Sequence, residues 1–269
     1  MADIHRTFSP EELVSYAYPG AAEPEGPWQY NNTNYILTGM VVSKATGLSY
    51  ADALKKMLLE PLRLRETYYR PRVPPQRVLD AMPSGYDELS ECEEGAHVAP
   101  PCARYPVDAL LGQDLKSINI SKSAADGGII ASLPDVARWV RALSSDTLLP
   151  PKQRAELFSL VSKASGQPIA TTSLTDPGGF ALGIGQNWLP FTGGPVWFYE
   201  GETLGYRAAW FRRPGDDLVV VMAVNSAVAD AKDNIGPLYK TVLGILEPQS
   251  VVDPGAPAPS TQPTQQPSQ

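Results

Sequence analysis

The first strong pattern in the chain is a helical spacing of apolar residues between Tyr30 and Gly47. One face of this segment collects Ile36, Leu37, Met40, Val41 and Ala45. We expect Asn32 to cap the N-terminus of this helix and Gly47 to end it. A second helix should follow directly, because Ser49 and Asp52 form a capping-box pattern.

The helical period is lost between residues 70 and 125 and returns at Asp126. We expect a long irregular insertion here, with a solvated loop at the acidic cluster of Asp87, Glu88, Glu91, Glu93 and Glu94. From Asp126 the pattern predicts a glycine turn, a short strand and a helix capped by Ser132 with Asp135. A further short helix is expected from Pro150 through Val161.

The last third of the chain has the pattern of strands. We expect them at residues 180–185, 196–201, 206–213 and 218–224. A turn at residues 214–217 makes the last two antiparallel, and a helix from Ile235 to Leu246 should pack on the sheet. The pattern thus predicts an α/β (α+β) fold over residues 1–252, with an antiparallel sheet flanked by helices. The Pro- and Gln-rich residues 253–269 are expected to be a disordered tail.

Composition and charge exclude several partners. The net charge is -7 and no basic stripe occurs, so we expect no nucleic-acid partner. The longest apolar run, residues 218–224, is far shorter than the roughly 20 residues that span a bilayer, so we expect no membrane span. Neither a phosphate-binding loop nor a dinucleotide fingerprint is present, and no cofactor is expected.

The two histidines limit the catalytic chemistry. A Ser-His-Asp hydrolase needs a histidine beside its serine, but His5 and His97 lie in polar, irregular segments and no G-x-S-x-G elbow occurs. His97 with Cys92 and Cys102 is the only histidine and cysteine cluster. Its loop is rich in glycine and proline and offers no fixed ligand geometry, so we expect no metal site.

Three segments resemble serine β-lactamases and penicillin-binding-protein-like hydrolases of the class C type. They are PWQYNNTNYILTGMVVSKATGLSYADALKKMLLEPL, SAADGGIIASLPDVARWVRAL and YEGETLGYRAAWFRRPGDDLVVVMAVNS. The first is similar to the region of the second family motif, the second to the glycine turn and its helix, and the third to the third-motif strand and hairpin. The resemblance covers roughly residues 8–247 and implies a β-lactamase/DD-peptidase-like fold.

Such enzymes use a serine and a lysine in S-x-x-K, a Tyr-x-Asn, and a Lys- or His-x-Gly on a strand beside the cleft. By position, Tyr30 matches the catalytic tyrosine that handles the nucleophile's proton, and Asn32 the asparagine that binds the substrate amide. The alternative interpretation is structural. Tyr30 would then pack under the helix, and Asn32 would merely cap it.

The third motif departs from the family pattern, because Tyr199-Glu200-Gly201 stands in the Lys/His-x-Gly position. A tyrosine, with an ordinary pKa of about 10, brings no positive charge to recognise a substrate carboxylate. Glu200 would repel a carboxylate if it faced the cleft. We therefore expect Tyr199, Glu200, Gly201 and Glu202 to bind neutral esters, neutral amides or cationic amines rather than penicillins. The alternative is that Tyr199 is an ordinary strand aromatic.

No lysine of the chain has a serine three residues before it, so S-x-x-K is absent from this sequence. We expect the nucleophile, its lysine, their helix and part of the sheet to lie outside it. The chain would then be the C-terminal part of a serine hydrolase that cleaves an ester, amide or β-lactam through an acyl-enzyme, and it would be inactive alone. The alternatives are a non-catalytic pseudoenzyme or binding module of the same fold, and a plain α/β domain with chance motifs.

Three further expectations concern the environment of the protein. Because relatives are mostly exported, the full-length protein is expected in the periplasm or outside the cell, although this chain shows no signal peptide. Cys92 and Cys102 could then form a disulfide, the alternative being two unrelated thiols. Without the missing elements an apolar face would be uncovered, and self-association through it is expected.

Overall fold

A seven-stranded antiparallel sheet forms the centre of the structure, in the order β10-β9-β8-β7-β6-β4-β5. The computed structural model describes residues 4–17, 28–87, 112–227 and 235–246. The strands of this sheet are β4 (Leu160–Ser162), β5 (Pro168–Ile169), β6 (Gly178–Phe180), β7 (Gly185–Leu189), β8 (Gly194–Thr203), β9 (Tyr206–Arg212) and β10 (Val219–Val224). Two small pairs complete the strands, namely β1 (Thr67–Tyr68) with β3 (Ile130–Ala131) and β2 (Tyr86–Asp87) with β11 (Ser226–Ala227).

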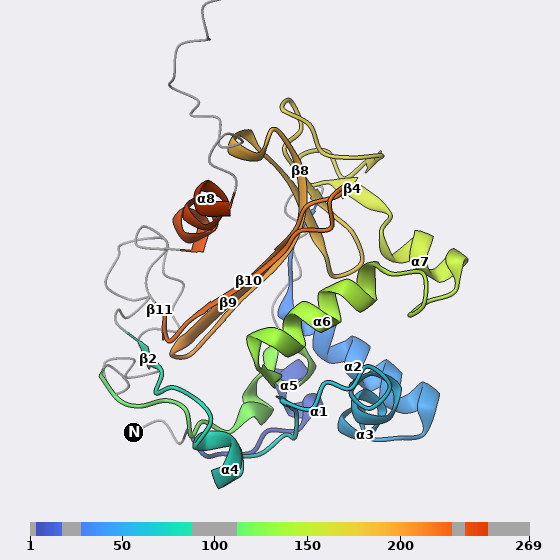
Figure 1. The fold of residues 1–269 in the computed structure, drawn as a ribbon. Coiled ribbons are helices and arrows are strands. Elements are labelled where there is room, and N and C mark those ends of the chain that lie inside the picture. The colour runs from blue at the N-terminus through green and yellow to red at the C-terminus, as the bar shows by residue number, and fades with distance from the viewer. Residues whose placement is uncertain (1–3, 18–27, 88–111, 228–234, 247–269) are drawn as a thin grey trace, which may run out of the picture.

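The described residues also form helices. They are α1 (Pro10–Ser15), α2 (Asn32–Thr46), α3 (Tyr50–Leu54), α4 (Gln76–Leu79), α5 (Ala124–Gly127), α6 (Leu133–Ser144), α7 (Pro151–Leu157) and α8 (Ile235–Leu246). A π-helical turn (Lys55–Leu59) extends α3, and two 3-10 turns cover Ile120–Lys122 and Pro190–Thr192. Figure 1 shows α8 on one side of β9 and β10 and α6 on the other, which confirms the predicted class of an antiparallel sheet flanked by helices.

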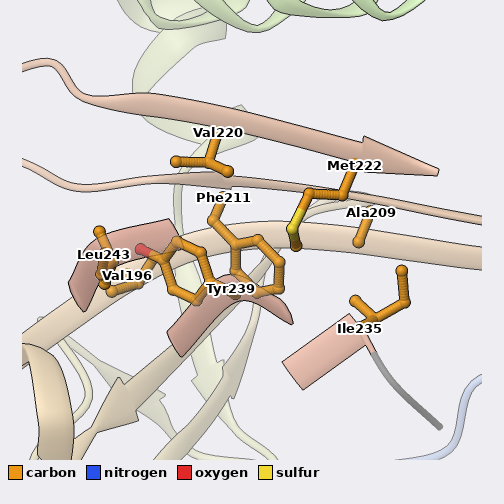
Figure 2. Close-up of a cluster of buried hydrophobic side chains, with 8 residues drawn as sticks. All are labelled: Val196, Ala209, Phe211, Val220, Met222, Ile235, Tyr239 and Leu243. Atoms are coloured by element: carbon orange, nitrogen blue, oxygen red, sulfur yellow. The ribbon is translucent and has the colours of Figure 1, made fainter. Parts of the chain in front are cut away.

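The main core lies between α8 and the sheet. There the ring of Tyr239 stacks on that of Phe211, with centroids 4.0 Å apart and planes 8° from parallel (Figure 2). The other buried side chains of this cluster are Val196, Ala209, Val220, Met222, Ile235 and Leu243. Burial of these apolar residues from β8, β9, β10 and α8 confirms the predicted packing of the last helix on the sheet.

Helix α2 confirms the predicted helix, but its cap is one residue earlier than expected. Asn31 has extended backbone, and its Oδ1 accepts a hydrogen bond from the Thr33 amide at 2.8 Å. Asn32 is the first helical residue, so the prediction that Asn32 is the N-cap is wrong. Either adjacent asparagine could serve as a cap, and the backbone conformation selects Asn31. Gly47 ends the helix as expected, with a φ of 67°.

Both predicted Ser-x-x-Asp caps are confirmed. Ser49 Oγ accepts from the Asp52 amide at 3.1 Å, and Ser132 Oγ accepts from the Asp135 amide at 3.4 Å. The buried Asp135 carboxylate also accepts from the Glu66 amide at 2.8 Å and forms an ion pair with Arg138. This network ties α6 to the segment that forms β1.

Two predictions in the sheet region are wrong. The helix expected through Val161 ends at Leu157, because Leu160 and Ser162 are buried on alternate positions and form β4. The single strand expected at residues 180–185 is the end of β6 and the start of β7, separated by a turn in which Gly183 has a φ of 79°. The other three expected strands correspond to β8, β9 and β10.

The described parts of residues 70–125 contain short elements that pack against the N-terminal segment. Leu115 and Ile118 are buried, and the Asn119 side chain donates hydrogen bonds to the His5 carbonyl and to Thr7. Several predictions concern residues outside the described ranges: Glu88, Glu91, Glu93 and Glu94 of the acidic cluster, the tail at 253–269, and the His97, Cys92 and Cys102 group. Asp87, the remaining member of the cluster, lies in β2 rather than in a loop.

Asp126, which the sequence predicts in a glycine turn and which lies in α5, gives a testable pH dependence. Within the described residues its Oδ1 atom is buried without a hydrogen-bond partner, and burial raises the pKa of Asp126 to about 6 despite the opposing charge of Lys122. A carboxyl that is harder to ionise in the folded state lowers stability as the pH rises from about 4 to about 6.

Asp126→Asn should therefore raise the free energy of unfolding at pH 7 by about 1 kcal/mol, a value reduced for the partial exposure of this group. The measurement is urea unfolding at pH 4, 5, 6 and 7, with Asp80→Asn as a surface control. A variant whose stability parallels that of the unchanged chain over this range would refute the burial of an ionisable Asp126.

Candidate active site

The structure brings the tyrosines of the second and third motifs together. Tyr30 lies two residues before α2, and the Tyr199 hydroxyl donates a hydrogen bond to the Tyr30 oxygen at 3.2 Å. Tyr30 is 41% exposed, so its hydroxyl is accessible from outside. Residues 169 positions apart in the sequence thus form one polar pair beside the sheet.

Tyr199 lies where one edge of β8 becomes open. Strand β7 pairs with β8 only from Gly194 to Phe198, and within the described residues no strand follows on that side from Tyr199 to Thr203. Burial raises the pKa of Tyr199 far above its ordinary value, and the hydrogen bond that it donates to Tyr30 acts in the same direction. Tyr199 is therefore a neutral hydrogen-bonding group at any working pH.

An aromatic group that the sequence analysis did not single out surrounds this pair. The ring centroid of Tyr35 lies 5.4 Å from that of Tyr30, and the centroid of Phe180 lies 6.5 Å from Tyr30 and 6.4 Å from Tyr199. Trp28 packs on Phe180 at 5.1 Å. The sequence does contain one sign of this aromatic group, because Trp28 and Tyr35 flank the Tyr-x-Asn motif on its two sides.

Lys163 places a cation against the same aromatic group. Its Nζ lies 5.0 Å from the ring centroid of Trp28 and 5.7 Å from that of Phe180. Both distances lie in the cation–π range. Burial lowers the pKa of Lys163, while the charge of Glu200 opposes this shift. Lys163 therefore links the segment that carries Tyr30 to the sheet.

The remaining third-motif residues alternate between the two faces of β8. Glu200 lines a hollow of about 430 Å³ beside α8, on the face opposite Tyr199, and its carboxylate lies 3.5 Å from Arg207. Glu202 lies 3.1 Å from the same arginine. Gly201 shares the face of Tyr199, and in the described chain a side-chain carbon added there would meet no atom within 4 Å. In this geometry Glu200 does not face the tyrosine pair.

Asn32 is exposed at the first position of α2. Because Asn31 provides the cap, the side-chain amide of Asn32 is not used for that purpose. Its role in substrate binding stays a prediction.

A largely apolar groove of about 690 Å³ runs along α2. Its walls include Ile36, Leu37, Met40, Val41, Tyr69 and Ala125. Leu37 and Val41 are 37% and 65% exposed. This face of α2 is therefore open to a further apolar element.

In the described parts of the chain, no cluster of three or more His, Cys, Asp or Glu side chains is placed to hold a metal ion. None of the helices in these parts is both long and apolar enough to cross a membrane.

An antiparallel sheet flanked by helices is the fold that this chain shares with solved structures of the serine β-lactamase and penicillin-binding-protein superfamily. The family model described as Beta-lactamase matches residues 7–241, and the chain belongs to this family. The match confirms the family that the three sequence segments indicated.

Curated relatives are penicillin-binding proteins. The chain is 27% identical over 158 residues to penicillin-binding protein 4* of Bacillus subtilis, a match covering 58% of the chain and 33% of that relative. It is 24% identical over 262 residues to penicillin-binding protein 4 of Amycolatopsis lactamdurans, covering 96% of the chain and 60% of that protein. The chain thus spans between a third and three fifths of the length of these relatives.

Solved structures share the fold at low sequence identity. A D-stereospecific amidohydrolase from Streptomyces sp. matches with a TM-score of 0.65 and 24% identity, over 82% of the chain and 58% of the amidohydrolase. A D-amino acid amidase from Ochrobactrum anthropi SV3, solved with D-phenylalanine, matches with a TM-score of 0.67 and 18% identity, over 93% of the chain and 67% of the amidase.

Proposed function

We propose that this chain is the part of a β-lactamase-related serine hydrolase that carries the proton-handling tyrosine and the third-motif strand. The nucleophilic serine and its lysine would come from a segment outside these 269 residues, since the sequence contains no S-x-x-K. The observation that carries the proposal is the hydrogen bond from Tyr199 to Tyr30, which joins two separate motifs into one site.

The proposed reaction is acyl transfer to the serine followed by hydrolysis. The serine oxygen forms a bond to the acyl carbon, and its proton passes through the Tyr30 oxygen to the leaving amine or alcohol as the scissile bond breaks. Water then cleaves the acyl-enzyme by the same proton route. The hydrogen bond donated by Tyr199 stabilises negative charge that develops on the Tyr30 oxygen.

The substrate class we propose is a neutral ester or amide with an apolar group beside the acyl carbon. Tyr199 is uncharged and cannot form an ion pair with a carboxylate, whereas the aromatic group of Trp28, Tyr35 and Phe180 offers a surface for a flat or apolar substituent. The fold neighbours include amidases and an amidohydrolase. Because curated relatives are penicillin-binding proteins, we also propose that the full-length protein works in the periplasm or outside the cell.

The groove along α2 supports the proposal that a further segment completes the site. The groove is lined by α2 from Ile36 onward, and Tyr30 lies two residues before this helix, so a helix placed in the groove would pack along the same helix that Tyr30 precedes. We propose that the helix bearing the serine and lysine occupies it. Self-association of the isolated chain through the same face stays a prediction.

The second candidate function is a binding module or pseudoenzyme of the same fold. The absence of S-x-x-K favours it, and the exposed Tyr30 with its aromatic neighbours could bind a ligand without cleaving it. The two candidate functions predict different activities once a segment with S-x-x-K is added: the hydrolase should become active, and the pseudoenzyme should not.

The deciding experiment compares the chain alone with the chain fused to the S-x-x-K-bearing segment of a penicillin-binding relative, called the joined protein below. The chain alone should not hydrolyse p-nitrophenyl esters or a chromogenic cephalosporin, because it contains no nucleophile for an acyl-enzyme. The joined protein should hydrolyse the ester. A folded joined protein without activity would support the pseudoenzyme, and turnover by the chain alone would overturn the proposal.

A further inference from the structure

Lys163 holds its ammonium group among three aromatic rings. Its Nζ lies 5.0 Å from the ring centroid of Trp28, 5.7 Å from that of Phe180 and 5.6 Å from that of Phe198. All three distances are within the roughly 6 Å over which a ring face attracts a cation. Rings gathered around one point in this way are the kind of site that binds the ammonium group of a ligand. Here the chain's own lysine occupies that site.

The lysine reaches the rings from a fixed position on the sheet. Its amide, one residue after β4, donates a hydrogen bond to the Gly178 carbonyl at 2.9 Å. A side-chain carbon added at Gly178 would lie 3.4 Å from the δ carbon of Lys163, so the lysine stem crosses this glycine. The side chain is half-buried, and burial lowers the pKa of Lys163. The ammonium is therefore partly withdrawn from water and held against the rings.

Two of these rings also belong to the proposed substrate surface. Trp28 and Phe180 pack on each other with centroids 5.1 Å apart, and the Phe180 centroid lies 6.5 Å from that of Tyr30. A substrate group placed on this surface would approach the ammonium of Lys163. An apolar group would gain contact with the rings, whereas a cationic group would be repelled by the like charge and kept from the ring faces that Lys163 uses.

We propose that Lys163 is a specificity-determining residue, which fills the aromatic site with its own ammonium and so excludes substrates that carry a cationic group. The inference rests on the proposed function and narrows its substrate class. An uncharged Tyr199 is compatible with neutral and cationic substrates alike, and Lys163 removes the cationic ones. Replacing Lys163 with a small neutral residue should convert the three rings into a binding site for a quaternary ammonium.

The direct test measures ligand binding to the whole 269-residue chain and needs no catalytic activity. The probes are choline and its neutral analogue, in which a tert-butyl group replaces the trimethylammonium group. The signal is the indole N–H resonance of Trp28, assigned from Trp28→Phe. In Lys163→Ala, choline should move this resonance and bind about 10-fold more tightly than it binds the unchanged chain, because the ring faces become free. It should also bind this variant about 10-fold more tightly than the neutral analogue does.

Two control variants separate the role of the charge at residue 163 from general effects. Lys163→Arg keeps a cation among the rings and should bind choline as weakly as the unchanged chain. Lys152→Met removes an exposed positive charge on α7 and should also leave choline binding unchanged. The inference would be overturned if choline bound Lys163→Ala no more tightly than the unchanged chain, or no more tightly than the neutral analogue. An equal gain in Lys152→Met would overturn it as well.

A second readout is kcat/KM in the joined protein for two p-nitrophenyl esters, whose acyl chains end in trimethylammonium or in tert-butyl. Lys163→Met keeps a side chain of similar length without the charge, so this readout does not require an open cavity. The variant should raise the ratio of cationic to neutral ester hydrolysis by about 10-fold, whereas Lys163→Arg should leave it unchanged. An unchanged ratio in Lys163→Met would refute the role in specificity. Complete inactivity of the unmutated joined protein would instead count against the proposed function, and choline binding to the chain alone would still decide the inference.

Discussion

Replacing Tyr30 with phenylalanine in the joined protein is expected to lower kcat by about 100-fold or more, the usual scale for a general acid-base group. The hydroxyl that accepts from Tyr199 would be lost, so the proton of the nucleophile would have no acceptor at that position. The measurement is kcat and KM for a p-nitrophenyl ester in both proteins.

Folding should not change in this variant. The Tyr30 ring keeps its contacts with Tyr35 and Phe180, and its hydroxyl is partly exposed. Melting temperatures therefore serve as one control. Tyr16→Phe serves as the other, because it removes an exposed hydroxyl bonded to Glu12 on α1. If Tyr30→Phe keeps more than about half of the activity at an unchanged melting temperature, Tyr30 is not a catalytic residue.

A change of specificity is expected when Tyr199 becomes lysine in the joined protein. A neutral phenol would be replaced by a cation at the open edge of β8, where it could bind a substrate carboxylate. Charge-assisted hydrogen bonds contribute about 1.5–3 kcal/mol. The ratio of kcat/KM for a carboxylate-bearing cephalosporin to that for a neutral ester should therefore rise by about 10- to 100-fold.

The matched variant is Tyr199→Gln, which also removes the phenol but adds no charge. It should weaken ester hydrolysis, because the phenol that donates to Tyr30 is replaced by a shorter amide, without favouring the cephalosporin. Equal effects of lysine and glutamine on the ratio would show that charge at residue 199 does not set specificity.

The long helices were predictable because their patterns are local. The apolar spacing in α2 and α8, and the two Ser-x-x-Asp caps, act within a few residues. The choice between Asn31 and Asn32 as the cap depends on backbone conformation, which the sequence does not reveal. The division of β6 from β7 likewise depends on the left-handed turn at Gly183.

The site was predictable only in part. Tyr30, Asn32 and the third-motif residues came from the resemblance, whereas the hydrogen bond between Tyr30 and Tyr199 depends on packing between distant segments. Tyr35 was missed because its helical position alone gives no sign of its contact with the Tyr30 ring. The sequence could have predicted that Glu200 and Tyr199 lie on opposite faces of the sheet, since neighbouring residues in a strand point to opposite sides.

The central claim is that this chain supplies the proton-handling half of an acyl-enzyme hydrolase. Its most direct test is intact mass measurement after treatment with a slowly hydrolysed acylating ester. The joined protein should gain the mass of one acyl group, mapped to the serine of the added segment, and Tyr30→Phe should gain it much more slowly. The chain alone should gain none. An acyl group on a serine of the chain alone, or acylation of the joined protein at the same rate with and without the Tyr30 hydroxyl, would contradict the claim.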